Sequence, residues 1–163
     1  MNLIVAVDEN WGIGLADDLQ FRIREDLRHF RALTLGKTVV LGRKTLQTFP
    51  NGRPLKDRQN FILSTRPGYE VPGAEVFASV DALVARCRQL DSESIFVIGG
   101  ASVYQALIGS CDRAYVTKVW ASRPADRYFP DLDRLPDWRL VESSAVQTEN
   151  DLRFQFLVYE KNS

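Results

Sequence analysis

The chain has 163 residues, 45% hydrophobic and 26% charged, which is ordinary for one globular domain spanning 1–163. Its 21 basic and 21 acidic residues cancel, so its charge favours neither a nucleic acid nor a membrane partner. Two cysteines form no metal-binding pair or disulfide framework, and a single histidine excludes a histidine-rich metal site. The apolar run 3–7 is too short for a signal peptide or a membrane span. We therefore expect a cytoplasmic, monomeric domain without a metal.

Apolar runs alternate with helical patterns over the first two thirds of the chain. This alternation predicts a mostly parallel sheet with helices on both faces, because parallel strands need crossover connections. The predicted strands are 3–7, 38–42, 60–64, 74–77 and 94–99, and the predicted helices are 25–35, 43–49, 80–90 (with Ser79 as its N-cap) and 101–108.

Beyond residue 111 the pattern changes to strands without long helices between them. The predicted strands are 113–120, 138–146 and 153–160, with a turn over 147–152 joining the last pair. We therefore expect a three-layer α/β domain whose central, mostly parallel sheet ends in an antiparallel C-terminal hairpin.

The helix expected over 25–35 carries two adjacent acids that point in different directions. At about 100° per residue, Asp26 falls within the apolar stripe, whereas Glu25 falls among the arginines. A carboxylate on an apolar stripe is costly unless it has a partner. Two interpretations remain open at this point. Asp26 either accepts hydrogen bonds from free N–H groups of the first turn, or it faces a pocket and handles a proton with a pKa raised by burial. His29, at the edge of the stripe, is expected at the surface near a carboxylate.

The segment 36–66 is basic, with seven lysines or arginines against one acid. A basic segment in a neutral chain indicates a small anionic ligand, although a solvated basic face explains it equally well. Three predicted strands end in features of phosphate sites. After 38–42, cations open a helix. After 60–64, hydroxyls and an arginine suit a 2′-phosphate, and a glycine pair ends 94–99. Each alone also fits an ordinary cap or turn, and the GxGxxG fingerprint is absent. The residues are Gly42, Arg43, Lys44 and Thr45; Ser64, Thr65 and Arg66; and Gly99 and Gly100.

The motifs together resemble those of bacterial dihydrofolate reductases over essentially the whole chain. The combination of LGRKT with IGGxxVY is the most specific part of the resemblance. It implies NADPH-dependent reduction of 7,8-dihydrofolate to 5,6,7,8-tetrahydrofolate, a step of one-carbon metabolism and an antifolate target. The matching stretches, in order, are LIVAV, GIG, EDLRHF, VVLGRKT, GRPL, NFILSTRPG, VIGGASVY, YVTKV and DRYFP.

For the substrate, the resemblance implies that Asp26 binds N3 and the 2-amino group of the pterin. The same acid assists protonation of N5 while a hydride passes from nicotinamide C4 to pterin C6. Thr117 is implied to hydrogen-bond this carboxylate, and Arg58 to hold the α-carboxylate of the substrate's glutamate, a bidentate task that suits guanidinium. The other implied substrate contacts are Ile4, Val5, Ala6, Leu27, Phe30, Phe49, Leu55 and Ile98.

For the cofactor, the resemblance implies that about 38–90 form an adenosine-binding lobe. Arg43, Thr65 and Arg66 match the 2′-phosphate site, and Lys44 and Thr45 match the pyrophosphate site. The loop 8–23 matches a mobile lid in which Gly12 and Gly14 supply flexibility, and the 99–100 bond matches a cis peptide of the family. The other implied cofactor contacts are Ala6, Ile13, Gly14, Gly42, Leu63, Ser64, Gly99, Gly100, Ala101, Ser102, Val103 and Tyr104.

The chain departs from the family pattern just before the helix acid. The family's Pro-Trp pair is Gln20-Phe21 here, and the customary proline before the acid is Arg24. A phenylalanine lacks the indole N–H that the family offers to an ordered water near the pterin, so we expect proton delivery at Phe21 to differ. The alternatives are a riboflavin-pathway pyrimidine reductase, a nucleotide-binding module without catalysis, and a duplicated, antifolate-resistant reductase.

Overall fold

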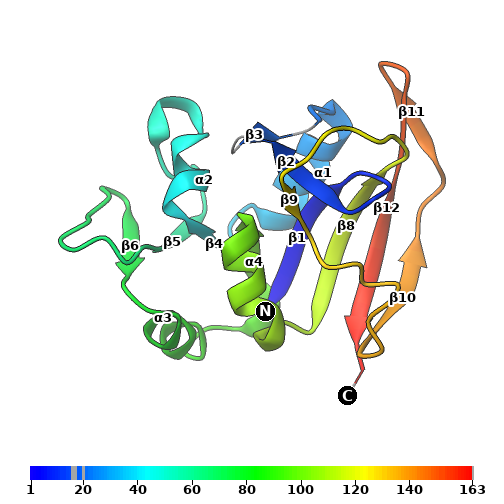
Figure 1. Ribbon diagram of the computed structural model, residues 1–163. Coiled ribbons are helices and arrows are strands. Elements are labelled where there is room, and N and C mark those ends of the chain that lie inside the picture. The colour runs from blue at the N-terminus through cyan, green and yellow to red at the C-terminus, as the bar shows by residue number, and fades with distance from the viewer. Residues whose placement is uncertain (16–17, 20, 163) are drawn as a thin grey trace.

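A computed structural model describes residues 1–15, 18–19 and 21–162. One mixed sheet runs through the molecule (Figure 1). Neighbouring strands are parallel throughout its larger part and antiparallel at the C-terminal edge, as predicted. In spatial order the strands are β10 (Trp138–Ser143), β12 (Leu152–Lys161), β8 (Arg113–Val119), β1 (Asn2–Val7), β7 (Ile95–Gly99), β4 (Thr38–Gly42), β5 (Gln59–Leu63) and β6 (Ala74–Phe77), with β11 (Gln147–Glu149) paired to β12.

Helices cover both faces of this sheet, which confirms the predicted three-layer α/β architecture (Figure 1). Alternation along β4 separates the faces, because Val40 packs in a core with Leu83 whereas its neighbour Val39 packs in another with Leu46. The helices are α1 (Arg24–Thr34) and α2 (Arg43–Gln47) on one face and α3 (Val80–Cys87) and α4 (Ala101–Leu107) on the other, with short 3₁₀ turns at Pro50–Gly52, Ser92–Ser94 and Ile108–Ser110. Among the described residues, no helix is long and apolar enough to cross a membrane.

Several element boundaries differ from the predictions. The helices α2 and α3 end two and three residues earlier than expected, although Ser79 caps α3 as predicted by accepting the Ala82 N–H at 3.1 Å. The predicted turn over 147–152 is wrong, because 147–149 form β11. The turn narrows to Asn150 and Asp151, both at positive φ (51° and 64°), a conformation that Asn and Asp tolerate better than most residues.

A second, three-stranded sheet joins the loop after β1 to the loop after β8 and was not predicted. Its strands are too short for a recognisable alternation, and β2 and β9 lie side by side in Figure 1. They are β3 (Asp18–Leu19), β2 (Gly12–Leu15) and β9 (Arg127–Tyr128).

The tight turn between β1 and β2 is organised by the buried carboxylate of Asp8. Its Oδ1 accepts hydrogen bonds from the N–H groups of Asn10 and Gly12, both at 2.8 Å. A Cβ at Gly12 would lie 2.9 Å from the Cβ of Ala125 and 3.1 Å from Asp8 Oδ2. Glycine is therefore required here for close approach between the two loops.

The buried cation of Lys118 packs against the Trp11 ring of this turn. Lys118 of β8 is only 5% exposed, and its Nζ lies 4.1 Å from the centre of the Trp11 ring. Burial lowers the pKa of Lys118, and the carboxylates of Asp133 and Asp131 oppose that shift. Because Trp11 also packs edge-on against Tyr159, the turn is tied to the sheet by both cation–π and aromatic contacts.

We expect Gly12→Ala to lower stability by about 1–3 kcal/mol, because overpacking forces the two loops apart. Gly109→Ala is the matched control, since a Cβ at Gly109 meets nothing within 4 Å. Thermal unfolding of both variants measures the difference, which corresponds to about 2–4 °C per kcal/mol in a chain of this size. Equal melting temperatures for the two variants would show that the loops do not depend on this contact.

Candidate functional site

Asp26 is anchored between α1 and the sheet. The buried Thr117 of β8, 3% exposed, donates its hydroxyl to Asp26 Oδ1 at 2.6 Å. Burial raises the pKa of the Asp26 carboxyl, and the hydrogen bond from Thr117 acts in the opposite direction. The neighbouring acid, Glu25, instead forms an exposed ion pair with Arg28 at 2.6 Å. The predicted separation of the two acids is confirmed.

The free N–H groups at the start of α1 are capped by Glu149, and Asp26 does not serve them. Ile23 occupies the N-cap position and has no side-chain acceptor. Glu149 Oε2 accepts the Arg24 N–H at 2.7 Å, and Oε1 accepts the Glu25 N–H at 3.3 Å. The first of the two interpretations of Asp26, that it accepts the free N–H groups of this turn, is therefore wrong. Sequence reasoning missed Glu149 because no local pattern connects it to α1, which lies more than a hundred residues away.

The position of His29 on the helix predicted a surface residue near a carboxylate. In the structure His29 instead packs against an aromatic ring. Its ring stacks on that of Phe156 with the centroids 4.0 Å apart and an interplanar angle of 18°. It is half-buried there, and burial lowers its pKa. His29 therefore packs α1 against β12, and the interpretation as a surface residue is wrong.

Arg58 meets the other end of α1. Its Nε donates to Thr34 Oγ1 at 3.2 Å, and its Nη1 donates to the carbonyl of Lys56 at 2.8 Å. Its guanidinium carbon lies 6.0 Å from the centre of the Phe30 ring, at the outer limit of a cation–π contact. On the same helix Leu27 is 59% exposed, which leaves an apolar side chain uncovered between Asp26 and the Arg58 end.

The middle of β1 and the end of β7 lie against α4. The Tyr104 hydroxyl donates to the carbonyl of Ile4 at 2.6 Å, and burial raises the pKa of this hydroxyl. The Gly99–Gly100 peptide bond is cis, as expected, and Gly99 has φ 132°. A Cβ at Gly100 would lie 3.2 Å from Thr45 Oγ1, so the glycine pair touches the first turn of α2.

Three cations stand unpaired beyond the ends of β4 and β5. These strands are parallel with Gly42 opposite Leu63, so the residues that follow them meet at one edge of the sheet. Within residues 1–15, 18–19 and 21–162, the side chains of Arg43, Lys44 and Arg66 form no hydrogen bond or ion pair. Thr65 adds an exposed hydroxyl beside Arg66. This donor set fits a ligand with several phosphate charges.

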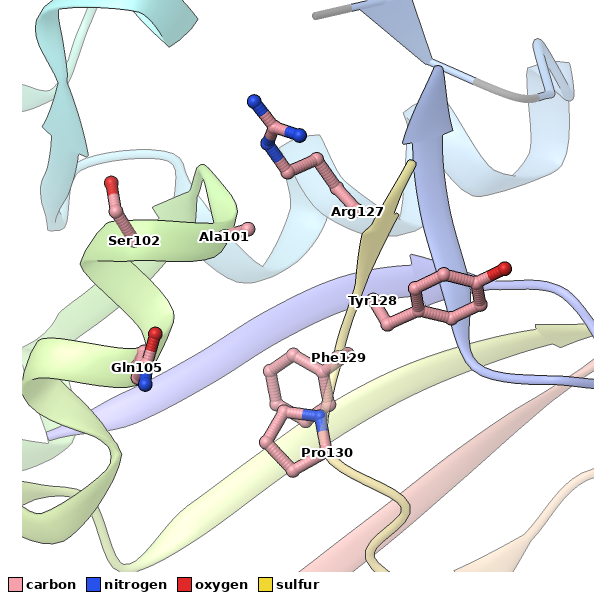
Figure 2. A pocket seen from close by; sticks show the side chains of 7 residues that line it. All are labelled: Ala101, Ser102, Gln105, Arg127, Tyr128, Phe129 and Pro130. Carbon is pink, nitrogen blue, oxygen red and sulfur yellow. The ribbon is translucent and has the colours of Figure 1, made fainter. Parts of the chain in front are cut away.

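A cavity of about 490 Å³ lies between α4 and β9 (Figure 2). Arg127 extends from β9 into it on the side of Ala101 and Ser102, and its Nη1 donates to the carbonyl of Asp126 at 3.1 Å. Sequence reasoning did not single out Arg127, because a lone arginine in a loop carries no signal. The lining residues are Ala101, Ser102, Gln105, Arg127, Tyr128, Phe129 and Pro130.

Phe21, which stands where the resemblance predicts tryptophan, forms a cation–π contact with Arg123. The guanidinium carbon of Arg123 lies 4.5 Å from the centre of the Phe21 ring, and the ring packs on a small core around Ile23 and Phe154. Its predecessor Gln20, and with it part of the segment matched to the family's lid, lies outside the described residues.

The remaining predicted site residues lie along the same edge of the sheet or next to it. Phe49 and Leu55 are half-buried against the core of β4, β5 and α2, to which Ile98 also belongs. A Cβ at Gly42 would lie 3.0 Å from Val103 Cγ2, which brings α4 close to the start of α2. Val5, Ala6, Ile13, Gly14, Leu63 and Ser64 are buried or half-buried on β1, β2 and the end of β5.

Comparison with known proteins identifies the family. The dihydrofolate reductase family model matches residues 1–161. Dihydrofolate reductase of Bacillus subtilis is 35% identical over 165 residues, which cover 100% of this chain and 95% of that protein. Dihydrofolate reductase type 3 of Salmonella typhimurium is 38% identical over 144 residues, covering 88% and 86%.

A solved structure agrees over the same length. Dihydrofolate reductase from Enterococcus faecalis, complexed with NADP(H) and RAB-propyl, superimposes with a TM-score of 0.86 at 29% identity, covering 99% of this chain and 96% of that one. The match over nearly the whole chain also decides against the riboflavin-pathway reductase that sequence reasoning left open. The chain belongs to the dihydrofolate reductase family.

Proposed function

We propose that this chain reduces 7,8-dihydrofolate to 5,6,7,8-tetrahydrofolate, with Asp26 as the group that binds the pterin and assists protonation of N5. The observation that carries this proposal is the carboxylate of Asp26, which is partly buried on α1 and hydrogen-bonded to Thr117 at 2.6 Å. NADPH, when bound, supplies the hydride for pterin C6.

The geometry around Asp26 suits an amidine-like partner. Thr117 donates one hydrogen bond to Oδ1 and leaves the other acceptor positions of the carboxylate available. The second oxygen, Oδ2, and the remaining lone pair of Oδ1 can accept two N–H groups from N3 and the 2-amino group of a pterin. Because burial raises the pKa of Asp26, the carboxyl holds a proton more readily than an exposed acid does, which suits a group that assists proton transfer.

The substrate's other groups find partners along α1. Arg58 is the proposed ligand of the glutamate α-carboxylate, because a guanidinium can bind both oxygens at once. The exposed side chain of Leu27, with Phe30 next to Arg58, gives apolar surface between the two charged ends. The other residues proposed around the pterin and aminobenzoyl rings are Ile4, Val5, Ala6, Phe49, Leu55 and Ile98.

The cofactor's phosphates are proposed to bind at the edge of the sheet where β4 and β5 end. Arg43, Thr65 and Arg66 would hold the 2′-phosphate, and Lys44 and Thr45 the pyrophosphate. The unpaired charges there support this assignment, since a polyanion would neutralise them. Segment 38–90 is proposed as the adenosine-binding lobe, and the other proposed contacts are Ala6, Ile13, Gly14, Gly42, Leu63, Ser64, Gly99, Gly100, Ala101, Ser102, Val103 and Tyr104.

Phe21 is proposed to change how a proton reaches the substrate. It fills the place of the family tryptophan, but its ring donates no hydrogen bond.

The protein is proposed to be a cytoplasmic monomer. The groups assigned to both ligands come from one chain, and the free thiols of Cys87 and Cys111 suit a reducing compartment.

Replacing Asp26 tests the proposed chemistry directly. We expect Asp26→Asn to lower kcat/KM for dihydrofolate by about 10²- to 10⁴-fold, the usual range for loss of general acid–base assistance. The measurement is NADPH oxidation followed spectrophotometrically at neutral pH. Glu25→Gln is the matched control, because the adjacent acid only forms a surface ion pair with Arg28. An inactive parent would overturn the proposed function, and a fully active Asp26→Asn would remove Asp26 from the proton path.

The raised pKa of Asp26 also makes stability depend on pH. A carboxyl with a raised folded-state pKa contributes fully below the unfolded value of 3.8, and that contribution is lost as the pH rises through the folded value. Asp26→Asn should therefore be more stable than the parent at pH 7, and its advantage should shrink as the pH falls from the raised folded-state pKa to 3.8, below which the difference should stay constant. Melting temperatures across this range check the prediction, and a difference independent of pH would contradict it.

Cofactor choice tests the phosphate assignment. We expect Arg43→Ala and Thr65→Ala each to lower kcat/KM for NADPH by about 10- to 100-fold, as charge-assisted hydrogen bonds are lost, while activity with NADH stays unchanged. Lys37→Ala is the control, because Lys37 precedes the opposite end of β4 within the same basic segment. A parent that uses NADH and NADPH equally well would refute the assignment.

A further inference from the structure

The first turn of α1 is held by a carboxylate from a distant hairpin. Glu149 is the last residue of β11, directly before the tight turn into β12. Its two oxygens accept the N–H groups of Arg24 and Glu25, at 2.7 and 3.3 Å. These are two of the donors that a helix start leaves without partners inside the helix. The cap is thus supplied across the fold in place of the apolar Ile23.

The donor of the shorter hydrogen bond is Arg24, at a position where the resemblance to the family predicts a proline. The family's customary proline before the helix acid is Arg24 here, at the first position of α1. Proline is well tolerated at that position but has no N–H to donate. Arg24 restores a donor, and the shorter of the two hydrogen bonds from Glu149 is made to it. The substitution and the distant acid are therefore complementary.

The hairpin that carries Glu149 also adjoins the other support of Asp26. Glu149 pairs with Leu152 at the start of β12, and Phe156 of β12 pairs with Thr117 of β8. Thr117 in turn donates to Asp26, the residue that follows Glu25. One strand pair thus borders the side-chain partner of Asp26 and carries the cap of the helix turn on which Asp26 stands.

We infer that Glu149 is a positioning residue for Asp26: its cap fixes the first turn of α1 so that the carboxylate keeps its hydrogen bond to Thr117. This inference rests on the proposed role of Asp26 in the reaction. The hydrogen bonds of Glu149 go to the backbone N–H groups of residues 24 and 25, so it acts on Asp26 through the helix backbone.

The test compares variants of the full chain by NADPH oxidation with dihydrofolate. Glu149→Ala should lower kcat/KM for dihydrofolate about fivefold to tenfold, because the turn that carries Asp26 loses its cap, and leave KM for NADPH unchanged. Glu149→Gln keeps one uncharged acceptor oxygen and should recover part of the loss. Glu142→Ala, which removes an exposed acid from β10, is the control and should change neither constant.

A double-mutant cycle separates positioning from stability alone. In the Asp26→Asn background, Glu149→Ala should cause no further loss of activity, because the carboxylate that it positions is gone. In the Arg24→Pro background, where one of the two donors is missing, Glu149→Ala should cost less than in the parent.

The outcomes distinguish the two proposals. A fully active Asp26→Asn contradicts the proposed function itself. If Asp26→Asn is impaired but Glu149→Ala only melts earlier with unchanged kinetics, the inference alone is overturned. Equal losses from Glu149→Ala in the parent and in Asp26→Asn also overturn it, and the Gln variant keeps the test decisive if the Ala variant fails to fold.

Discussion

The hydrogen bond from Thr117 to Asp26 joins the helix of the candidate site to the sheet. It matters because a carboxylate on the apolar side of a helix is tolerated only when a neighbour satisfies it. Thr117 is buried in the strand next to β1, so the position of the acid is set by the most central part of the fold. The same burial that makes the acid costly raises its pKa, which is the property a proton-handling group needs.

The cationic end of the site is organised in the opposite way. Arg43, Lys44 and Arg66 stand where two parallel strands end, and no carboxylate in the described part of the chain neutralises them. One end therefore combines burial of a single acid with a hydroxyl partner, whereas the other end has three cations without a partner in the described part of the chain. The glycine pair at 99–100 lies between them against Thr45, where a side chain would crowd the first turn of α2.

The departures from the family are accompanied by contacts that suit the new residues. Phe21 has no N–H but presents a ring face, and the Arg123 guanidinium lies over it. Arg24 has the N–H that proline lacks, and Glu149 accepts it. A further charged contact, unrelated to these departures, is that of Lys118 with the ring of Trp11, at the turn that leads into the segment matched to the lid. These contacts lie around the start of α1 and the turn after β1, so this chain secures that region with charges from distant segments.

Periodicity and local chemistry in the sequence determined the layered fold, the separation of Asp26 from Glu25, and the strand ends that are followed by cationic and hydroxyl side chains. These depend on spacing along one element, which the sequence displays directly. Tertiary structure alone decided the Glu149 cap, the stacking of His29 on Phe156, the close approach of Gly12 to Ala125, and the small sheet of β2, β3 and β9. Each joins residues far apart in the chain through geometry that no local pattern records, because a lone acid or glycine looks the same in sequence whether or not a distant backbone needs it.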